Sequence, residues 1–264
     1  MNLTKKLLAG LTAFIIGFVG TSLYSNYSKK EKQIVSSALA NEKSGSTILT
    51  QEEIENHISR STFRLLGITP FGMIAATGVV VRSGKLGSYL ITNKHFCNPT
   101  RLTPFEHAIM GEVEEFRPSL ILKDSSKIRG FVSAVDINAD LCLVHFPDLT
   151  NAETMHQYSD GYASPGEKIV TIGFPGSYRS QQKYYGFAGK LDSTSQIFFH
   201  QKAEIHAEGG QSGSGIYRLN GDLIGLLNRG FPQEDGTHNN MNTALVPISD
   251  VKRFLCREIQ VACQ

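Results

Sequence analysis

The 264-residue chain has no tryptophan, only four cysteines and few charged side chains, and these shortages exclude several classes of protein. Charged residues make up 19% of the chain and hydrophobic residues 41%, which leaves enough apolar surface for a buried core and excludes an intrinsically disordered protein. Outside residues 1–32 the chain holds 21 basic and 23 acidic residues. Without a clustered basic surface, we expect no nucleic-acid partner. Cysteine and histidine show no zinc-ligand spacing, so no metal site and no cofactor is expected.

The N-terminus carries a long uncharged run. Lys5 and Lys6 precede residues 7–28, which hold no charged side chain. As a helix these residues span about 33 Å, enough to cross a bilayer, but the second half is polar and the apolar part matches a signal-peptide core. We expect an extracytoplasmic protein, periplasmic or secreted. Residues 1–28 are predicted to be either a cleaved signal peptide or a hydrophobic anchor helix, with membrane association through residues 7–28. Residues 29–58 are polar, and we expect them to form a linker that leads into a short helix near Gln51–Ile58.

From Ser61 onward the chain consists of short apolar runs separated by turn signals such as Pro175-Gly176 and Asn220-Gly221. Many short strands with almost no helical period favour an all-β barrel or sandwich. Asn220-Gly221, placed between two strand-like runs, predicts a β-hairpin. A C-terminal helix over about 250–261 is predicted from apolar residues at helical spacing, behind Ser249-Asp250, which can cap its first turn.

The four cysteines are Cys97, Cys142, Cys256 and Cys263. An even number in an exported chain allows disulfides, although four unpaired thiols remain an alternative. On one helix Cys256 and Cys263 would be separated by about 10 Å of rise, too far for a bond. They can pair only if the helix ends before Cys263.

The residues with the clearest chemical signature are in the segment Glu208-Gly209-Gly210-Gln211-Ser212-Gly213-Ser214-Gly215. A serine becomes a nucleophile when a base removes its proton and hydrogen-bond donors stabilise the oxyanion. The glycines allow a tight turn, which lets the amides of Gly210 and Ser212 point at one spot as an oxyanion hole. Such a segment also occurs in flexible linkers, but here it lies between strand-like runs.

A base and an orienting acid are found at strand ends. His95 follows the apolar run 89–92, where a rigid strand end would leave its ring free for proton transfer. Asp140 precedes the apolar run 141–144. Asp136 is a rival for the same role, but no apolar run follows it directly.

Histidine, aspartate and serine occur in the order and spacing of chymotrypsin-type serine proteases. Thr92-Asn93-Lys94-His95, Ala139-Asp140-Leu141 and Gly210-Gln211-Ser212-Gly213-Ser214 carry the resemblance, which extends over about residues 62–255. The chain is most similar to the bacterial glutamyl-endopeptidase and Deg/HtrA-type branches.

The resemblance implies two antiparallel six-stranded β-barrels with the active site between them. His95 and Asp140 would come from the first barrel and Ser212 from the second. It also implies protein or peptide substrates. Cys97 and Cys142 each lie two residues beyond a member of the implied triad, so they would be neighbours and are a candidate disulfide.

The chain departs from the family at two positions beside the serine. Ser214 replaces a common glycine, as in the glutamyl-endopeptidase branch. Gln211 replaces the aspartate that binds a newly cut N-terminus in trypsin-like zymogens. We therefore expect a protease domain that needs no ion-pair activation. No PDZ domain, and hence no regulation through one, is expected from the chain's end.

The resemblance places the substrate pocket along His206, Ala207 and Glu208 and along the strand that contains Asn228, Arg229 and Gly230. Leu227 stands where glutamate-selecting relatives carry a histidine, so the specificity is left open. His206 and Arg229 would favour an acidic side chain, whereas Glu208 would oppose it.

The predicted organisation is a signal or anchor at 1–28, a linker at 29–58 and a protease domain at 59–264. Within this domain the barrels are expected at about 62–150 and 160–250. The predicted function is a serine endopeptidase. The alternatives are a catalytically inactive, protease-like binding module and an esterase that uses the same triad.

Overall fold

The structure is a computed structural model. It describes residues 49–69, 72–97, 119–122, 128–155, 157–176, 180–192, 200–232 and 238–263. The chain divides into two units, residues 1–49 and 50–264. The signal or anchor predicted at 1–28 and most of the predicted linker lie outside the described residues. Within those residues, no helix combines the length and the apolar character needed to span a bilayer.

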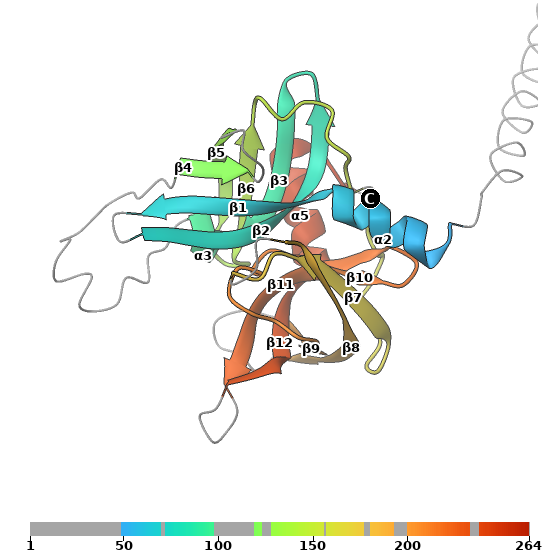
Figure 1. Ribbon diagram of the computed structural model, residues 1–264. Coiled ribbons are helices and arrows are strands. Elements are labelled where there is room, and N and C mark those ends of the chain that lie inside the picture. The colour runs from blue at the N-terminus through green and yellow to red at the C-terminus, as the bar shows by residue number, and fades with distance from the viewer. Residues whose placement is uncertain are drawn as a thin grey trace, which may run out of the picture. The chain divides into compact units, whose positions relative to one another are not determined.

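Six antiparallel strands form the first closed barrel, in the order β1-β2-β3-β6-β5-β4 (Figure 1). The strands are β1 (Thr62–Thr69), β2 (Gly72–Gly84), β3 (Gly87–Asn93), β4 (Ser119–Leu122), β5 (Arg129–Asp136) and β6 (Leu141–Phe146). Between β2 and β3 the chain reverses at Gly87, whose φ is +105°. A Cβ there would lie 2.4 Å from the Phe146 carbonyl oxygen, so the turn requires glycine. The sequence predicts an all-β fold, and the structure confirms a mostly-β fold with a six-stranded barrel.

A second set of six strands forms another closed barrel, in the order β10-β11-β12-β9-β8-β7. Its strands are β7 (Lys168–Gly173), β8 (Gln182–Asp192), β9 (His200–Glu204), β10 (Gly215–Arg218), β11 (Leu223–Pro232) and β12 (His238–Pro247). The hairpin predicted at Asn220-Gly221 joins β10 to β11, and Gly221 has a φ of +94°. Positive φ at this position is what the Asn-Gly pair provides.

The C-terminal helix α5 (Ile248–Ile259) is present, as predicted, and its apolar face is buried. Val251, Phe254 and Leu255 belong to one core cluster that also holds Val79 of β2 and Val170 of β7, so this cluster joins the two barrels and the helix. The predicted cap is wrong. The helix begins at Ile248 after Pro247 without a side-chain cap, because Ser249 and Asp250 already lie in its first turn.

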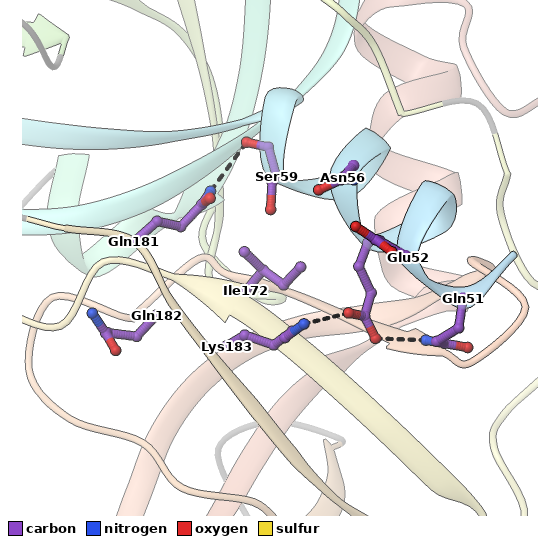
Figure 2. Close-up of a pocket in the computed structure, with 9 residues that line it drawn as sticks. Gln51, Glu52, Asn56, Ser59, Ile172, Gln181, Gln182 and Lys183 are labelled. Carbon is purple, nitrogen blue, oxygen red and sulfur yellow. Dashed lines mark hydrogen bonds and ion pairs between the residues drawn. The ribbon is translucent and has the colours of Figure 1, made fainter.

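The helix expected near Gln51–Ile58 is α2 (Gln51–Arg60), which starts at a capping box formed by Thr50 and Glu53. Glu55 accepts hydrogen bonds from Lys183 and Tyr185 of β8, which ties the helix to the second barrel. Burial raises the pKa of Glu55, but these hydrogen bonds outweigh it, and the net pKa is lowered. Figure 2 shows the pocket of about 510 Å³ between α2 and this edge of the barrel, with Gln181 turned toward the Ser59 carbonyl.

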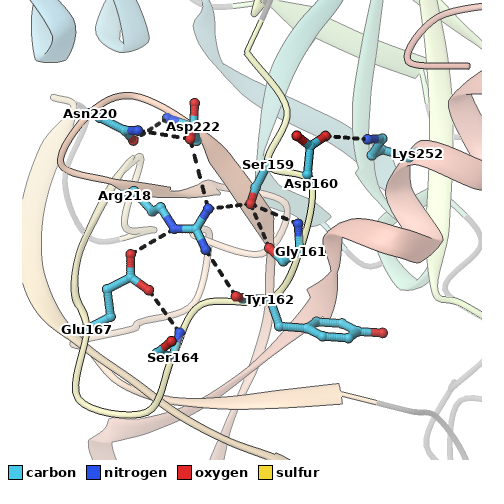
Figure 3. Close-up of polar contacts among 10 residues, drawn as sticks. All are labelled: Ser159, Asp160, Gly161, Tyr162, Ser164, Glu167, Arg218, Asn220, Asp222 and Lys252. Atoms are coloured by element: carbon cyan, nitrogen blue, oxygen red, sulfur yellow. Dashed lines mark hydrogen bonds and ion pairs between the residues drawn. The ribbon is translucent and has the colours of Figure 1, made fainter. Parts of the chain in front are cut away.

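The connection between the barrels is held to the β10–β11 hairpin by Arg218 (Figure 3). Its guanidinium donates to Glu167 (2.7 Å), to the Ser159 hydroxyl (2.5 Å) and to the Tyr162 carbonyl (3.0 Å). Because guanidinium donors diverge in one plane, a single side chain can fix three points of this loop. The connection therefore runs along the second barrel rather than away from it.

Candidate active site

The pairing of β3 with β6 brings His95 close to Asp140. The two strands are antiparallel neighbours, with Asn93 opposite Leu141 at the end of the ladder. His95 follows β3 in the short helix α3 (Lys94–Cys97), and Asp140 directly precedes β6. The end of one strand thus lies beside the start of the other, although the two residues are 45 positions apart.

Asp140 holds His95 through both carboxylate oxygens. One oxygen is 2.8 Å from the imidazole Nδ1, and the other accepts the His95 backbone N–H at 2.9 Å. Asp140 is 6% exposed and has a φ of +53°, a conformation that few residues other than glycine adopt. Its carbonyl also accepts hydrogen bonds from the Lys94 amide and the Asn93 side chain. A carboxylate at Nδ1 fixes the tautomer and leaves Nε2 to exchange a proton.

The rival residue Asp136 has other partners. Its carboxylate accepts the backbone N–H groups of Asn138 and Ala139, and it pairs with Arg257 of α5. Among the described residues, no hydrogen bond joins Asp136 to His95.

Two disulfides are formed. The candidate pair Cys97–Cys142 is present and links α3 to β6 beside the contact between His95 and Asp140. Cys256 and Cys263 are also paired. The condition stated for that pair is met, because α5 ends at Ile259 and Gln260 turns into the left-handed conformation.

Ser212 lies in a tight loop between β9 and β10. Gly210 and Gly213 on either side of it have φ values of +93° and +85°. The loop is attached to β11, since the Gly213 N–H donates to the Leu227 carbonyl at 2.8 Å. Within the described part of the chain, the backbone N–H groups of Gly210 and Ser212 donate to no other group. Two unengaged amides in one tight turn are suited to bind an oxyanion.

The Ser212 hydroxyl donates to the carbonyl oxygen of Asn228 at 3.2 Å. No hydrogen bond between Ser212 and His95 occurs among the described residues. The structure therefore brings His95 and Asp140 into contact, whereas the Ser212 hydroxyl is hydrogen-bonded to the Asn228 carbonyl.

Gln211, next to the serine, is completely buried. Its side-chain oxygen accepts the backbone N–H of Glu208 at 2.7 Å, so the side chain folds back onto its own loop. An aspartate that awaited a new N-terminus would need a charged partner at this buried position. Gln211 instead supports the loop without a charge.

The residues predicted to line the substrate pocket include a hydrogen-bonded pair, His206 and Glu208. His206 lies 2.7 Å from Glu208, between Nε2 and the carboxylate oxygen, and its ring packs against Tyr184 at 4.6 Å between centroids. Ala207 and Asn228 are buried. Arg229 and Gly230 lie in β11, but their side-chain surroundings are outside the described structure. The His206 ring is thus engaged within the protein by Glu208 and Tyr184.

Thr77 is a further residue at this site that the sequence reasoning missed. It lies on β2 of the first barrel, is fully buried, and contacts the loop that carries Ser212. A β-branched residue in an apolar strand is ordinary, so no sequence signal distinguished Thr77 from a core residue. Across the described part of the chain, no cluster of side chains is suited to hold a metal ion.

A family model for the trypsin-like peptidase domain matches residues 76–226, more than half of the chain. Among solved structures, the active form of the Rv3671c protease from M. tuberculosis is similar, with 14% identity and a TM-score of 0.60 over 82% of this chain and 88% of that one. The serine endoprotease from Yersinia pestis has 14% identity and a TM-score of 0.59, covering 80% of this chain and 67% of that one. An HtrA-type protease in a structure with a tripeptide has 16% identity and a TM-score of 0.59, covering 81% and 65%. At these sequence identities, the similarity to the solved structures is a similarity of fold.

Proposed function

The chain belongs to the trypsin-like peptidase family and is therefore a serine protease, and from that premise we propose which residues perform its chemistry. The proposed activity is that of an endopeptidase that hydrolyses peptide bonds in protein or peptide substrates through His95, Asp140 and Ser212. The observation that carries the proposal is the double hydrogen bond between Asp140 and His95. In this proposal the two barrels form a chymotrypsin-like pair with the active site between them.

In the proposed reaction, the Ser212 hydroxyl leaves the Asn228 carbonyl and turns toward His95. Its oxygen attacks the scissile carbonyl carbon while the imidazole Nε2 takes its proton, and Asp140 stabilises the imidazolium that forms. The negative oxygen of the tetrahedral intermediate is bound by the amides of Gly210 and Ser212. The proton then passes to the departing amine, which leaves an acyl-enzyme ester on Ser212. A water molecule, deprotonated by the same imidazole, hydrolyses that ester and restores the serine.

Asp140 and Asp136 provide a matched pair of variants for this proposal. Asp140→Asn keeps the shape but presents the imidazole with a different hydrogen-bonding pattern, and the corresponding change lowers kcat by about 10⁴-fold in a related triad. Asp136→Asn removes the carboxylate at the end of β5, which among the described residues forms no hydrogen bond with His95. We expect peptide hydrolysis to fall by several orders of magnitude in the first variant and by less than about threefold in the second. Equal activity in the two would contradict the assignment of Asp140.

A second candidate function is a protease-like binding module without catalysis. The hydrogen bond from Ser212 to Asn228, in place of one to His95, favours it. The two functions differ in reactivity. An endopeptidase cleaves a protein substrate and loses this activity in Ser212→Ala, whereas a binding module retains its binding in that variant and cleaves nothing.

We also propose that the chain works outside the cytoplasm, with residues 1–28 as a signal peptide or anchor, residues 29–58 as a linker and residues 59–264 as the protease domain. The uncharged run at 7–28 and the two disulfides support this location. The test is cell fractionation followed by N-terminal sequencing of the mature protein. A start beyond residue 20 indicates cleavage, an intact N-terminus in the membrane fraction indicates an anchor, and recovery from the cytoplasm contradicts export.

A further inference from the structure

Every carbonyl of the segment 209–212 accepts a hydrogen bond. Two of the four donors belong to the second barrel, and the other two belong to a single residue, Thr77 of the first barrel. The donors, in order from Gly209 to Ser212, are the Gly176 amide, the Thr77 hydroxyl (2.9 Å), the Ser214 amide (2.9 Å) and the Thr77 amide (2.9 Å).

These bonds determine where the two unengaged amides point. A trans peptide is planar, and its C=O and N–H groups point in opposite directions. The bond to the Gly209 carbonyl therefore sets the direction of the Gly210 N–H, and the bond to the Gln211 carbonyl sets that of the Ser212 N–H. The peptide between them carries the Gly210 carbonyl, and the Thr77 hydroxyl holds it. The other side of this peptide is the Gln211 N–H, which donates to the Glu208 carbonyl at 3.1 Å. Among the described residues, that bond within the loop is what still holds the peptide once the Thr77 hydroxyl is removed, and Gly210, with a φ of +93°, has no side chain to restrict it.

The direction of the hydroxyl proton of Thr77 is also determined. Its Oγ1 lies 3.0 Å from the Phe174 N–H, which can only donate, so the hydroxyl must direct its own proton to the Gly210 carbonyl. The Thr77 carbonyl accepts the Thr92 hydroxyl at 2.8 Å. Thr92 lies on β3, three residues before His95. A hydrogen-bonded path thus runs from the strand that leads to the base to the loop that carries the nucleophile.

We propose that Thr77 is a positioning residue that aligns the Gly210 and Ser212 amides for the oxyanion from the opposite barrel. This inference rests on the proposed function, because it assigns a role in that reaction. Thr77 touches no reacting atom and acts through the loop. Losing one oxyanion donor typically lowers kcat about 100- to 1000-fold. Because Thr77 acts indirectly, we expect its loss to lower kcat by about 10- to 100-fold.

The test compares Thr77→Val, which removes the hydroxyl and keeps the shape, with Thr77→Ser, which keeps the hydroxyl, in the full chain. Thr62→Val is the matched control, since Thr62 is buried on β1 and its hydroxyl also donates to a main-chain carbonyl, that of Ile58 at 2.7 Å. We expect kcat for a peptide substrate to fall about 10- to 100-fold in Thr77→Val with KM within about threefold. Thr77→Ser and Thr62→Val should stay within about threefold in both.

Amide hydrogen exchange by mass spectrometry provides a readout that does not depend on activity. The amides of Gln211 and Ser214 donate to carbonyls within the loop, and the Gly213 amide donates to the Leu227 carbonyl of β11. We expect these amides to exchange about tenfold faster or more in Thr77→Val than in the wild type. In Thr62→Val their exchange rates should be unchanged.

Unchanged kcat and unchanged exchange in Thr77→Val would overturn the role of Thr77, and so would an equal loss in Thr77→Ser. A wild-type chain that hydrolyses nothing would contradict the proposed function instead. In that case the exchange measurement alone decides whether Thr77 holds the loop.

Discussion

The disulfide Cys97–Cys142 should contribute more to stability than Cys256–Cys263. The first closes a separation of 45 residues and joins two segments of the first barrel, and the second closes a separation of 7 residues at the end of α5. In the chain-entropy account, a cross-link stabilises by restricting the unfolded chain, and the effect grows with the length of the closed loop. This gives about 4.0 kcal/mol for Cys97–Cys142 and about 2.4 kcal/mol for Cys256–Cys263 at 25 °C.

The assay is urea unfolding of the wild type and of two double variants, Cys97→Ala with Cys142→Ala and Cys256→Ala with Cys263→Ala. The free energy of unfolding should fall by about 1.6 kcal/mol more in the first variant than in the second. Both cysteines of the first pair are buried, with exposures of 3% and 0%, so lost packing adds to the difference in the same direction. A larger loss in the second variant, or equal losses, would refute the reasoning from loop length.

Two further changes test single positions. Gly210→Ala should lower kcat about 100-fold or more, because φ is +93° and a Cβ would lie 2.6 Å from the Gly176 nitrogen; Gly209→Ala, with no atom within 4 Å, is the control. Comparable kcat values in the two would contradict this role of Gly210. The hydrogen bond from Arg60, with His57 nearby, lowers the pKa of Glu153 from 4.5 to about 2. The ionised carboxylate therefore stabilises the fold above pH 4.5, and this contribution is lost as the pH falls toward 2. Thermal midpoints of Glu153→Gln should depend less on pH in that range, and an unchanged pH dependence would argue against the pair.

The contacts that follow from strand order were within reach of sequence reasoning. His95 and Asp140 each border an apolar run, and strands that pair antiparallel bring the end of one run beside the start of the other. The Asn220-Gly221 hairpin followed from turn chemistry that depends on two residues alone. In both cases the information lies in a few adjacent positions.

The contacts that depend on a rotamer or on a distant backbone were out of reach. The Ser212 hydroxyl is directed by a carbonyl 16 residues away, and its orientation has no sequence signature. The bonds of Thr77 to the loop join positions more than 130 residues apart and use backbone carbonyls, which every residue has. The cap predicted at Ser249-Asp250 is absent for a local reason: Pro247, two residues before Ser249, already has the extended conformation of the N-cap.

The reactivity of Ser212 is the central claim, and labelling by a fluorophosphonate probe tests it most directly. The full chain would be labelled beside Ser212→Ala and His95→Ala, with the fold of each checked by circular dichroism. The account predicts labelling of the wild type that disappears in both variants. A folded wild type that takes up no label, or a His95→Ala variant that is labelled as fast as the wild type, would contradict it.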